Sequence, residues 1–286
     1  MKKIKVLLSG HTGFVGKSLH SKLNLDDRLE LILMSRSNGF DLTDNKNLKN
    51  IECDIIINLS GLVSIEDGWV DPHSMFKDNY LITLNLLELS RINQASFIHI
   101  SSYVYGVPQY LPIDEQHPVS GYNPYSSTKV ILDLLSSDYG KHFKFPVTVL
   151  RPFNLYGENQ KTNFFIAALM DTIISKKSLD IIDLNARRDY LWVGDFTSAI
   201  EKVIFGQKEG VHIYNVGSGK SYSANEVIDT IQNCTGQSVN FYQSHPKTIL
   251  IQDCYSDNKL FSHDFNWKPG TSIDQGIKKF YDFLKM

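Results

Sequence analysis

Tyr125 and Lys129, four residues apart, form the pair in this sequence best suited to proton transfer. On a helix, residues i and i+4 lie on one face, about one turn apart. Because an ammonium group beside a phenol favours the phenolate, the spacing predicts a tyrosine pKa below its ordinary value of about 10. Such a tyrosine could act as a general acid or base near neutral pH.

Ser101 is the third residue that could take part in this chemistry. It directly follows the apolar run 97–100, which predicts a strand. In open α/β sheets ligands bind beyond the carboxyl ends of the strands. We therefore expect the Ser101 hydroxyl beside the helix that carries Tyr125, and we predict a catalytic group of Ser101, Tyr125 and Lys129.

Three glycines, Gly10, Gly13 and Gly16, lie between the apolar run 4–8 and an amphipathic segment. Glycines at such a turn let the backbone approach a pyrophosphate and let helix pack on strand, with the phosphates at the helix N-terminus. The spacing G-x-x-G-x-x-G differs from the general G-x-G-x-x-G fingerprint. With a strand before it and a helix after it, the loop predicts dinucleotide binding rather than a purely structural turn.

The end of the second expected strand, 29–34, indicates which dinucleotide binds. An acidic residue about 20 residues beyond the glycine loop would hydrogen-bond the ribose of NAD, whereas an arginine would accommodate the 2′-phosphate of NADP. Here Ser35 and Arg36 follow the strand and no acid is present. A hydroxyl beside a guanidinium suits a phosphate, so we expect NADP. The alternative is NAD, with Arg36 stacked on adenine.

Short apolar runs alternate with helical patterns in the first half of the chain, which predicts βαβ units and a parallel sheet. The fold class expected is α/β, a Rossmann-like doubly wound sheet with a smaller C-terminal substrate-binding domain. We expect residues 1–153 to form the dinucleotide-binding domain, completed by about 187–216, and residues 154–286 to form the substrate-binding part. The expected strands are 4–8, 29–34, 54–59, 97–100, 147–150, 179–182 and 212–216, and the expected helices are 14–23, a long one opened by Asp71 and Pro72, 125–139 closed by Gly140, 164–175, 194–205 and 224–234.

A series of motifs in chain order resembles the extended short-chain dehydrogenase/reductase family, in its group of nucleotide-sugar epimerases, dehydratases and reductases. The resemblance covers nearly the whole chain. The matching motifs are the Gly10–Gly16 loop, Asp41-Leu42, Leu59-Ser60-Gly61, Asn79, Ser101 four residues before Tyr105 together with Tyr125 and Lys129, the segment Arg151–Gly157, and Arg188-Asp189-Tyr190 with Val193 and Asp195, followed by the further signature 214–219.

The resemblance implies roles for individual residues of this chain. Together with the residues argued above, the implied cofactor-binding set is Gly10, Thr12, Gly13, Phe14, Val15, Gly16, Ser35, Arg36, Asp41, Leu42, Leu59, Ser60, Gly61, Asn79, Tyr125, Lys129, Pro152 and Asn154. The implied substrate-binding set is Ser102, Tyr103, Asn154, Asn163 and Arg188, the arginine being placed at a nucleotide diphosphate.

Departures from the family patterns narrow the expected activity. Related 4,6-dehydratases carry an Asp-Glu pair where this chain has Ser102 and Tyr103, and the GDP-fucose synthase type carries a Cys and a His where it has Tyr103 and Asn163. The length of 286 residues is nearer to that of the 4-ketoreductases. The resemblance therefore implies an NADP-dependent reductase of a nucleotide-activated 4-keto-6-deoxysugar. The alternatives are a C4 epimerase with retained NAD and, more remotely, a non-catalytic redox-sensing protein.

Composition excludes several other classes. The 29 basic and 31 acidic residues leave a net charge of −2, which gives no basic surface for nucleic acid. No apolar run reaches the roughly 18–20 residues of a membrane helix, and the three cysteines and nine histidines have no disulfide or metal spacing. We expect a cytoplasmic homodimer whose partner is a nucleotide-sugar substrate, without nucleic acid, membrane or metal.

Overall fold

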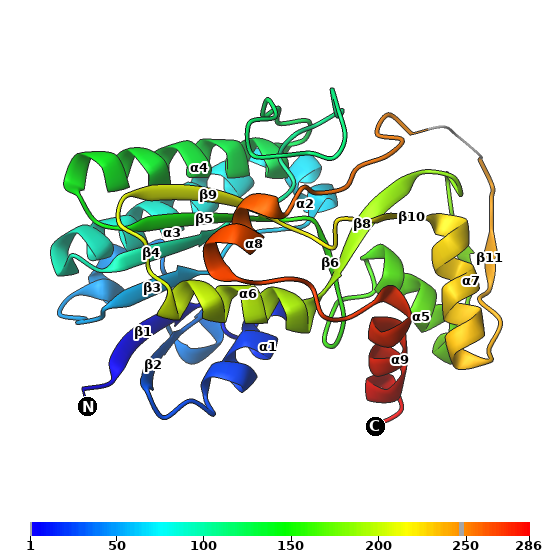
Figure 1. Cartoon of the computed structure of the whole chain (residues 1–286), viewed down its shortest axis with the longest axis horizontal. Coiled ribbons are helices and arrows are strands. Elements are labelled where there is room, and N and C mark those ends of the chain that lie inside the picture. Colours follow the sequence, from blue (N-terminus) through cyan, green and yellow to red (C-terminus); the bar gives the residue numbers. More distant parts are fainter. Residues whose placement is uncertain (1, 246–248) are drawn as a thin grey trace. The chain divides into compact units, whose positions relative to one another are not determined.

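The computed structural model describes residues 2–245 and 249–286 (Figure 1). These residues form two compact units. Unit 1 comprises 1–106, 118–152 and 199–214, and unit 2 comprises 107–117, 153–198 and 215–286. Relative to the expected division, the segment 107–117 falls in unit 2, and the segment that completes unit 1 begins at residue 199 rather than near 187.

Unit 1 is built on a six-stranded sheet with the strand order β2-β1-β3-β4-β5-β9. The strand β1 pairs in parallel with β2 on one side and β3 on the other, and β3-β4 and β4-β5 are also parallel. The chain therefore reverses its direction of winding between β1 and β3, which confirms the predicted doubly wound sheet. The strands are β1 (Ile4–Ser9), β2 (Leu29–Met34), β3 (Ile55–Asn58), β4 (Ser96–Ile100), β5 (Val147–Pro152) and β9 (Val211–Val216), whose last two residues belong to unit 2.

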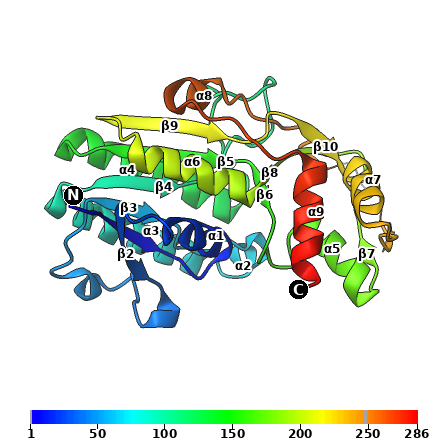
Figure 2. The same ribbon diagram turned by 60° about the horizontal axis from the view of Figure 1, so that its bottom comes forward.

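Helices cover both faces of this sheet (Figures 1 and 2). On one face α3 (Pro72–Asn93) packs against α4 (Pro124–Phe143), with the short α2 (Ile65–Val70) beside them. On the other face lie α1 (Phe14–Leu23) and the C-terminal part of α6 (Val193–Phe205), joined by an ion pair between Lys22 and Glu201 at 3.0 Å. None of the described helices is long and apolar enough to span a bilayer.

The sheet core follows from the uninterrupted apolar runs of the sequence. All four residues of β3 are buried, and Ile56 and Ile57 are fully so. A strand covered by helices on both faces is apolar at successive rather than alternate positions, and the run Ile55-Ile56-Ile57 shows the pattern that predicted this strand. The core thus fixes the carboxyl ends of β1, β3 and β4, from which the candidate site residues project.

The helix α4 corrects one prediction. It ends at Phe143, with Lys144 in the left-handed conformation (φ +60°), so Gly140 lies inside the helix and does not close it. A Cβ at Gly140 would lie 2.6 Å from a methyl carbon of Val147. This glycine therefore serves close packing of α4 on β5, a role that sequence alone does not separate from a helix cap.

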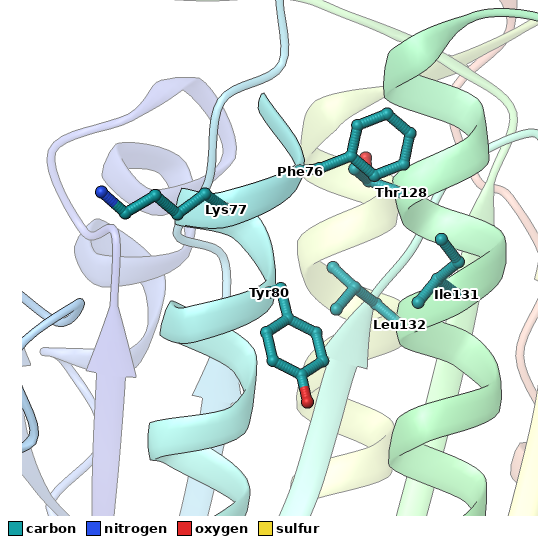
Figure 3. Close-up of a pocket in the computed structure, with 6 residues that line it drawn as sticks. All are labelled: Phe76, Lys77, Tyr80, Thr128, Ile131 and Leu132. Carbon is teal, nitrogen blue, oxygen red and sulfur yellow. The ribbon is translucent and has the colours of Figure 1, made fainter. Parts of the chain in front are cut away.

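A cavity of about 300 Å³ lies between α3 and α4, and Figure 3 shows six residues that line it. Tyr80 and Ile131 are exposed at this face, whereas Leu132 is buried. Most of the side chains that line the cavity are apolar, and Lys77 carries the one amino group among them. The residues drawn are Phe76, Lys77, Tyr80, Thr128, Ile131 and Leu132.

Unit 2 contains two small sheets and several helices. The three-stranded sheet has the order β10-β8-β6, and a two-stranded sheet pairs β11 with β7. Most of these short elements were not predicted, and β7 is shorter than the expected strand 179–182. The elements are β6 (Asn154–Tyr156), α5 (Phe165–Ser175), β7 (Leu179–Asp180), β8 (Arg187–Trp192), the N-terminal part of α6, β10 (Ser221–Ser223), α7 (Ala224–Thr235), β11 (Phe241–Tyr242), α8 (Lys259–Phe265) and α9 (Ile273–Leu284).

Candidate active site

The glycine loop is packed so closely that a side chain at Gly10 or Gly16 would clash with backbone atoms. Gly10 has a φ of +72°, and a Cβ there would lie 2.8 Å from the Leu59 backbone. A Cβ at Gly16 would lie only 2.1 Å from the Gly10 carbonyl oxygen. Gly13 is the N-cap of α1 and supplies no side-chain cap, so N–H groups of the first turn remain available to an anion. The loop therefore fits a pyrophosphate group held by backbone N–H groups.

A cavity of about 220 Å³ opens beside this loop and gathers many of the predicted cofactor residues. It is enclosed by the carboxyl ends of β1, β2 and β3. Nine lining residues were predicted: Gly10, Thr12, Gly13, Ser35, Arg36, Leu42, Leu59, Ser60 and Gly61. Three were missed: Phe40, Leu62 and Ile82. The first two adjoin predicted positions and could have been found from them, whereas Ile82 comes from the middle of α3 and carries no sequence signal.

Asn79, which was predicted to bind the cofactor, is hydrogen-bonded to the loop after β3. Its side chain is buried, accepts a hydrogen bond from the Leu62 N–H at 2.7 Å and donates one to the Leu62 carbonyl at 3.0 Å. Asn79 therefore holds the loop after β3, which lines the cavity. Asp41 is exposed and lies outside the lining, and hydrogen bonds from Thr43 lower the pKa of its carboxyl. Phe14, Val15, Gly16, Tyr125, Lys129, Pro152 and Asn154 are also outside the lining.

The tip after β2 presents a guanidinium to this cavity. The Arg36 side chain is 57% exposed and pairs with Asp78, with 2.9 Å between Nη2 and Oδ2. Ser35 is buried, and its hydroxyl lies 2.8 Å from the Ser37 hydroxyl and 3.0 Å from Asn38 Oδ1. The Ser35 hydroxyl is thus occupied within the tip, whereas the guanidinium is accessible to a ligand that competes with Asp78.

The helix α4 positions the tyrosine and the lysine. Asn123 caps the helix by accepting a hydrogen bond from the Ser126 N–H at 2.7 Å, so Tyr125 lies in the first turn. Lys129 is buried and donates from Nζ to the Ile100 carbonyl at 2.8 Å. The Lys129 Nζ atom lies 5.8 Å from the centre of the Tyr125 ring. The capped helix and the end of β4 therefore bring the predicted pair together.

The electrostatics of the pair differ from the prediction. Burial raises the pKa of Tyr125 to about 12, with a hydrogen bond from Ser102 opposing the shift. The expected depression by Lys129 is absent because the ammonium is bonded to the Ile100 carbonyl and lies over the phenol ring rather than at its oxygen. Burial lowers the pKa of Lys129 to about 8, against the opposing field of Asp133. Near neutral pH the phenol therefore keeps its proton and is a proton donor.

The two serines after β4 lie near different groups, Ser102 near Tyr125 and Ser101 near Asp133. Ser102 is the hydroxyl that reaches the Tyr125 phenol. The Ser101 hydroxyl is buried without a partner at full hydrogen-bond geometry among the described residues. Burial raises the pKa of the Asp133 carboxyl, and the Ser101 hydroxyl is one of the groups that oppose this rise. Ser101 therefore faces the buried carboxylate rather than the phenol. Tyr103 is buried and donates its hydroxyl proton to the Gly106 carbonyl at 2.6 Å.

The other predicted substrate residues belong to unit 2. Arg188 donates to the carbonyl of Arg187 at 2.7 Å, and no carboxylate pairs with it in the part of the chain that the structure describes. Asn154 donates to the Asp189 carbonyl at 3.1 Å, and Asn163 is exposed. The guanidinium of Arg188 is thus free of a competing acid.

The buried Asp189 carboxylate is an anchor of unit 2. It accepts two hydrogen bonds from Ser218, one from the Gly219 N–H and two from Ser256. These bonds oppose the rise that burial causes in the pKa of this carboxyl. Asp189 therefore ties β8 to two segments that follow it in the chain, and it leaves no acceptor for Arg188.

Comparison with known proteins agrees with this geometry. A Methanocaldococcus jannaschii protein with the name of a UDP-glucose 4-epimerase is 27% identical over 98% of both chains. GDP-6-deoxy-D-mannose reductase from Pseudomonas aeruginosa is 28% identical over 96% of this chain and 95% of its own. The solved structure of Pseudomonas aeruginosa RMD with NADPH superposes with a TM-score of 0.90 at 26% identity, over 99% of this chain and all of that one.

The family comparison gives the same result. Residues 6–217 match the model of the NAD dependent epimerase/dehydratase family, from the first strand to the Asn215–Gly217 segment. This match spans the glycine loop, the tyrosine–lysine helix and the Arg151–Gly157 segment, which carried the resemblance. The chain belongs to the NAD dependent epimerase/dehydratase family.

Proposed function

We propose that the protein is an NADP-dependent reductase of a nucleotide-activated 4-keto-6-deoxysugar. The observation that carries the proposal is the lining of the cofactor cavity, which includes the Arg36 guanidinium and no carboxylate. Such a site favours a 2′-phosphate over the free ribose hydroxyls of NAD. An exchangeable NADPH suits a reductase, whereas an epimerase retains NAD. The similarity to GDP-6-deoxy-D-mannose reductase and to the NADPH-bound RMD supports this choice.

In the proposed reaction the side chains supply a proton and orientation. NADPH, when bound, supplies the hydride that reduces the keto carbon. Tyr125 donates its phenol proton to the developing alkoxide, and Ser102 orients the phenol. Ser101 is assigned a second hydrogen bond to the same oxygen, because its buried hydroxyl has no hydrogen-bond partner among the described residues. Lys129 keeps two protons for the ribose hydroxyls because one is donated to the Ile100 carbonyl.

The second candidate is a nucleotide-sugar C4 epimerase with retained NAD. It is favoured by the match to the Methanocaldococcus jannaschii protein, which is aligned over 98% of its length. The same tyrosine and lysine would serve both reactions, so the residues of α4 do not separate them. The difference lies in the fate of the cofactor, which a reductase consumes in proportion to product and an epimerase regenerates.

A panel of nucleotide 4-keto-6-deoxysugars and nucleotide hexoses tests the proposal. The purified protein is incubated with each compound and NADPH, and the absorbance of NADPH is followed alongside the sugar products. We expect a 4-keto sugar to be reduced with one NADPH consumed per product. Interconversion of hexose epimers without net NADPH loss would establish the epimerase instead.

The choice between NADP and NAD depends on Arg36. Charged hydrogen bonds contribute about 1.5–3 kcal/mol, so Arg36→Ala should weaken NADPH binding roughly 10–100-fold and change NADH binding little. Fluorescence titration of both reduced cofactors measures the two affinities. Asp78→Asn is the matched variant, since it removes the nearer of the two carboxylates that pair with the guanidinium, the other being Asp41 at 4.0 Å, and it should tighten NADPH binding. Equal losses for both cofactors in Arg36→Ala would mean that the arginine stacks on adenine.

We propose that Arg188 binds the diphosphate of the substrate. Its guanidinium has no carboxylate partner to give up among the described residues, and charge-assisted hydrogen bonds to phosphate are strong. Arg188→Ala should raise the substrate KM about tenfold or more, with a smaller effect on turnover at saturation. The adjacent Arg187, which pairs with Glu226, gives the control variant Arg187→Ala. An unchanged KM in Arg188→Ala would show that this arginine does not contact substrate.

We also propose that the protein works in the cytoplasm as a homodimer. The apolar cavity of Figure 3 and the exposed Tyr80 and Ile131 beside it support association through the α3–α4 face. Light scattering is expected to give twice the 32.6 kDa of one chain. Ile131→Lys should shift the mass toward that of one chain, and a monomeric wild-type protein would disprove the association.

A further inference from the structure

A buried ion pair lies behind the tyrosine–lysine pair and has no part in the reaction as proposed. Arg151, on β5, pairs with Asp133, on α4, with 2.8 Å between Nε and Oδ2. Their side chains are 6% and 5% exposed. Arg151 also donates to the Tyr105 hydroxyl at 3.0 Å. Because burying two charges has a large desolvation cost, such a pair is weak support for stability alone, and a second role is worth testing.

Asp133 lies one helical turn beyond Lys129. The two residues are spaced i and i+4 on α4, which places them on one face of the helix. One carboxylate oxygen of Asp133 is bonded to Arg151, and the other, Oδ1, has no hydrogen-bond partner within the described ranges. The field of Asp133 opposes the lowering that burial causes in the pKa of Lys129. Burial raises the pKa of the Asp133 carboxyl, and the charges of Arg151 and Lys129 oppose that rise.

The other groups around Lys129 do not supply this negative charge. His99, on β4, has Nε2 at 3.8 Å from Asp133 Oδ1, and burial lowers its pKa well below 6.5, so the ring is neutral. Tyr125, in the same helix, keeps its proton because its pKa is raised. Arg151 is a cation and disfavours a second positive charge nearby. Asp133 is therefore the group that carries negative charge in this cluster, and it faces two cations, Arg151 and Lys129.

We propose that Asp133 is a positioning residue that keeps Lys129 in its ammonium form and, through Arg151, fixes α4 against β5 behind the active site. The inference rests on the proposed function, in which the Lys129 ammonium holds the cofactor ribose. A neutral lysine would have one donor fewer and no charge beside the phenol. Asp133 acts through Lys129 and makes no contact with the reacting groups.

The test is a direct titration of Lys129 in the full chain. Lysine labelled with ¹³C at Cε gives signals that shift when Nζ loses its proton, and Lys129→Met identifies the signal of Lys129. We expect a wild-type midpoint near pH 8. Since Asp133→Asn alone would leave the buried Arg151 unpaired, the comparison is made in the Arg151→Met background. There, adding Asp133→Asn should lower the midpoint by roughly 1–3 pH units, the usual effect of losing a nearby opposite charge.

The sign of the shift separates this role from a purely structural one. If Asp133 served packing only, its loss would let water reach Lys129 and raise the midpoint toward the ordinary value of about 10.5. A rise or an unchanged midpoint would overturn the proposal. Asp133→Glu should keep the midpoint near that of wild type, and Asp138→Asn, at an exposed acid of the same helix, should not change it. The titration needs no substrate, so it is informative even if the proposed reductase activity fails.

Discussion

Tyr125→Phe is expected to lower turnover about 10²–10⁴-fold, the usual contribution of a general acid. The change removes the proton that the developing alkoxide must receive and leaves the ring in place. Burial keeps this phenol protonated near neutral pH, which suits it to donation. Turnover is measured at saturating NADPH and substrate, with NADPH binding followed separately by fluorescence.

The controls separate lost chemistry from lost structure. Tyr125 does not line the cofactor cavity, so Tyr125→Phe should bind NADPH with nearly the wild-type affinity. Tyr139→Phe removes a phenol from the same helix, far from its N-terminus, and should leave turnover within a few-fold of wild type. Turnover within a few-fold of wild type in Tyr125→Phe would remove this residue from the proton-donor role.

Among alanine substitutions at the glycines of the cofactor loop, Gly16→Ala is expected to reduce NADPH binding the most. The new Cβ would lie 2.1 Å from the Gly10 carbonyl oxygen and 2.7 Å from the His11 Cα, and both atoms are backbone. Overpacking typically costs about 1–3 kcal/mol and occasionally more, so NADPH affinity should fall by roughly 5–150-fold. Fluorescence titration and thermal unfolding together measure how the cost divides between binding and stability.

Two other glycines provide graded comparisons. A Cβ at Gly13 would lie 3.3 Å from the Gly10 oxygen, a milder contact, so Gly13→Ala should have a smaller effect. A Cβ at Gly270 would come no closer than 3.8 Å to another atom, so Gly270→Ala should bind NADPH like wild type. If Gly16→Ala bound NADPH as tightly as Gly270→Ala, the loop would not be the cofactor cradle.

The fold of unit 1 could be predicted because its strands are buried on both faces and its turns carry specific chemistry. Three of the four positions of β3 are isoleucine and all four are buried. Asp71 with Pro72 opens α3 as predicted, and the Asp71 carboxylate accepts a hydrogen bond from the Ser74 N–H at 3.0 Å. In contrast, β6, β10 and β11 have two or three residues each, too few to show a period. They form because tertiary contacts, such as those of Asp189, hold them in place.

The candidate site could be predicted where it depends on backbone shape and not where it depends on burial. The glycine loop specifies a close approach that only glycine permits, so most of the cavity lining followed from it. The pKa of Tyr125 depends on how deeply the phenol is buried and on where the Lys129 ammonium is directed. The four-residue spacing of the two residues predicts neither. The role proposed for Asp133 could have been suggested from its position one turn after Lys129.

The five hydrogen bonds to Asp189 also have a consequence for folding of the chain during its synthesis on the ribosome. A ribosome releases β8 well before Ser218, Gly219 and Ser256, so the nascent chain first carries this carboxylate without the partners that satisfy it in the folded unit. Burying it at that stage would leave a charge uncompensated. The β10-β8-β6 sheet should therefore stay open and hydrated during synthesis and close only after residue 256 has emerged from the exit tunnel.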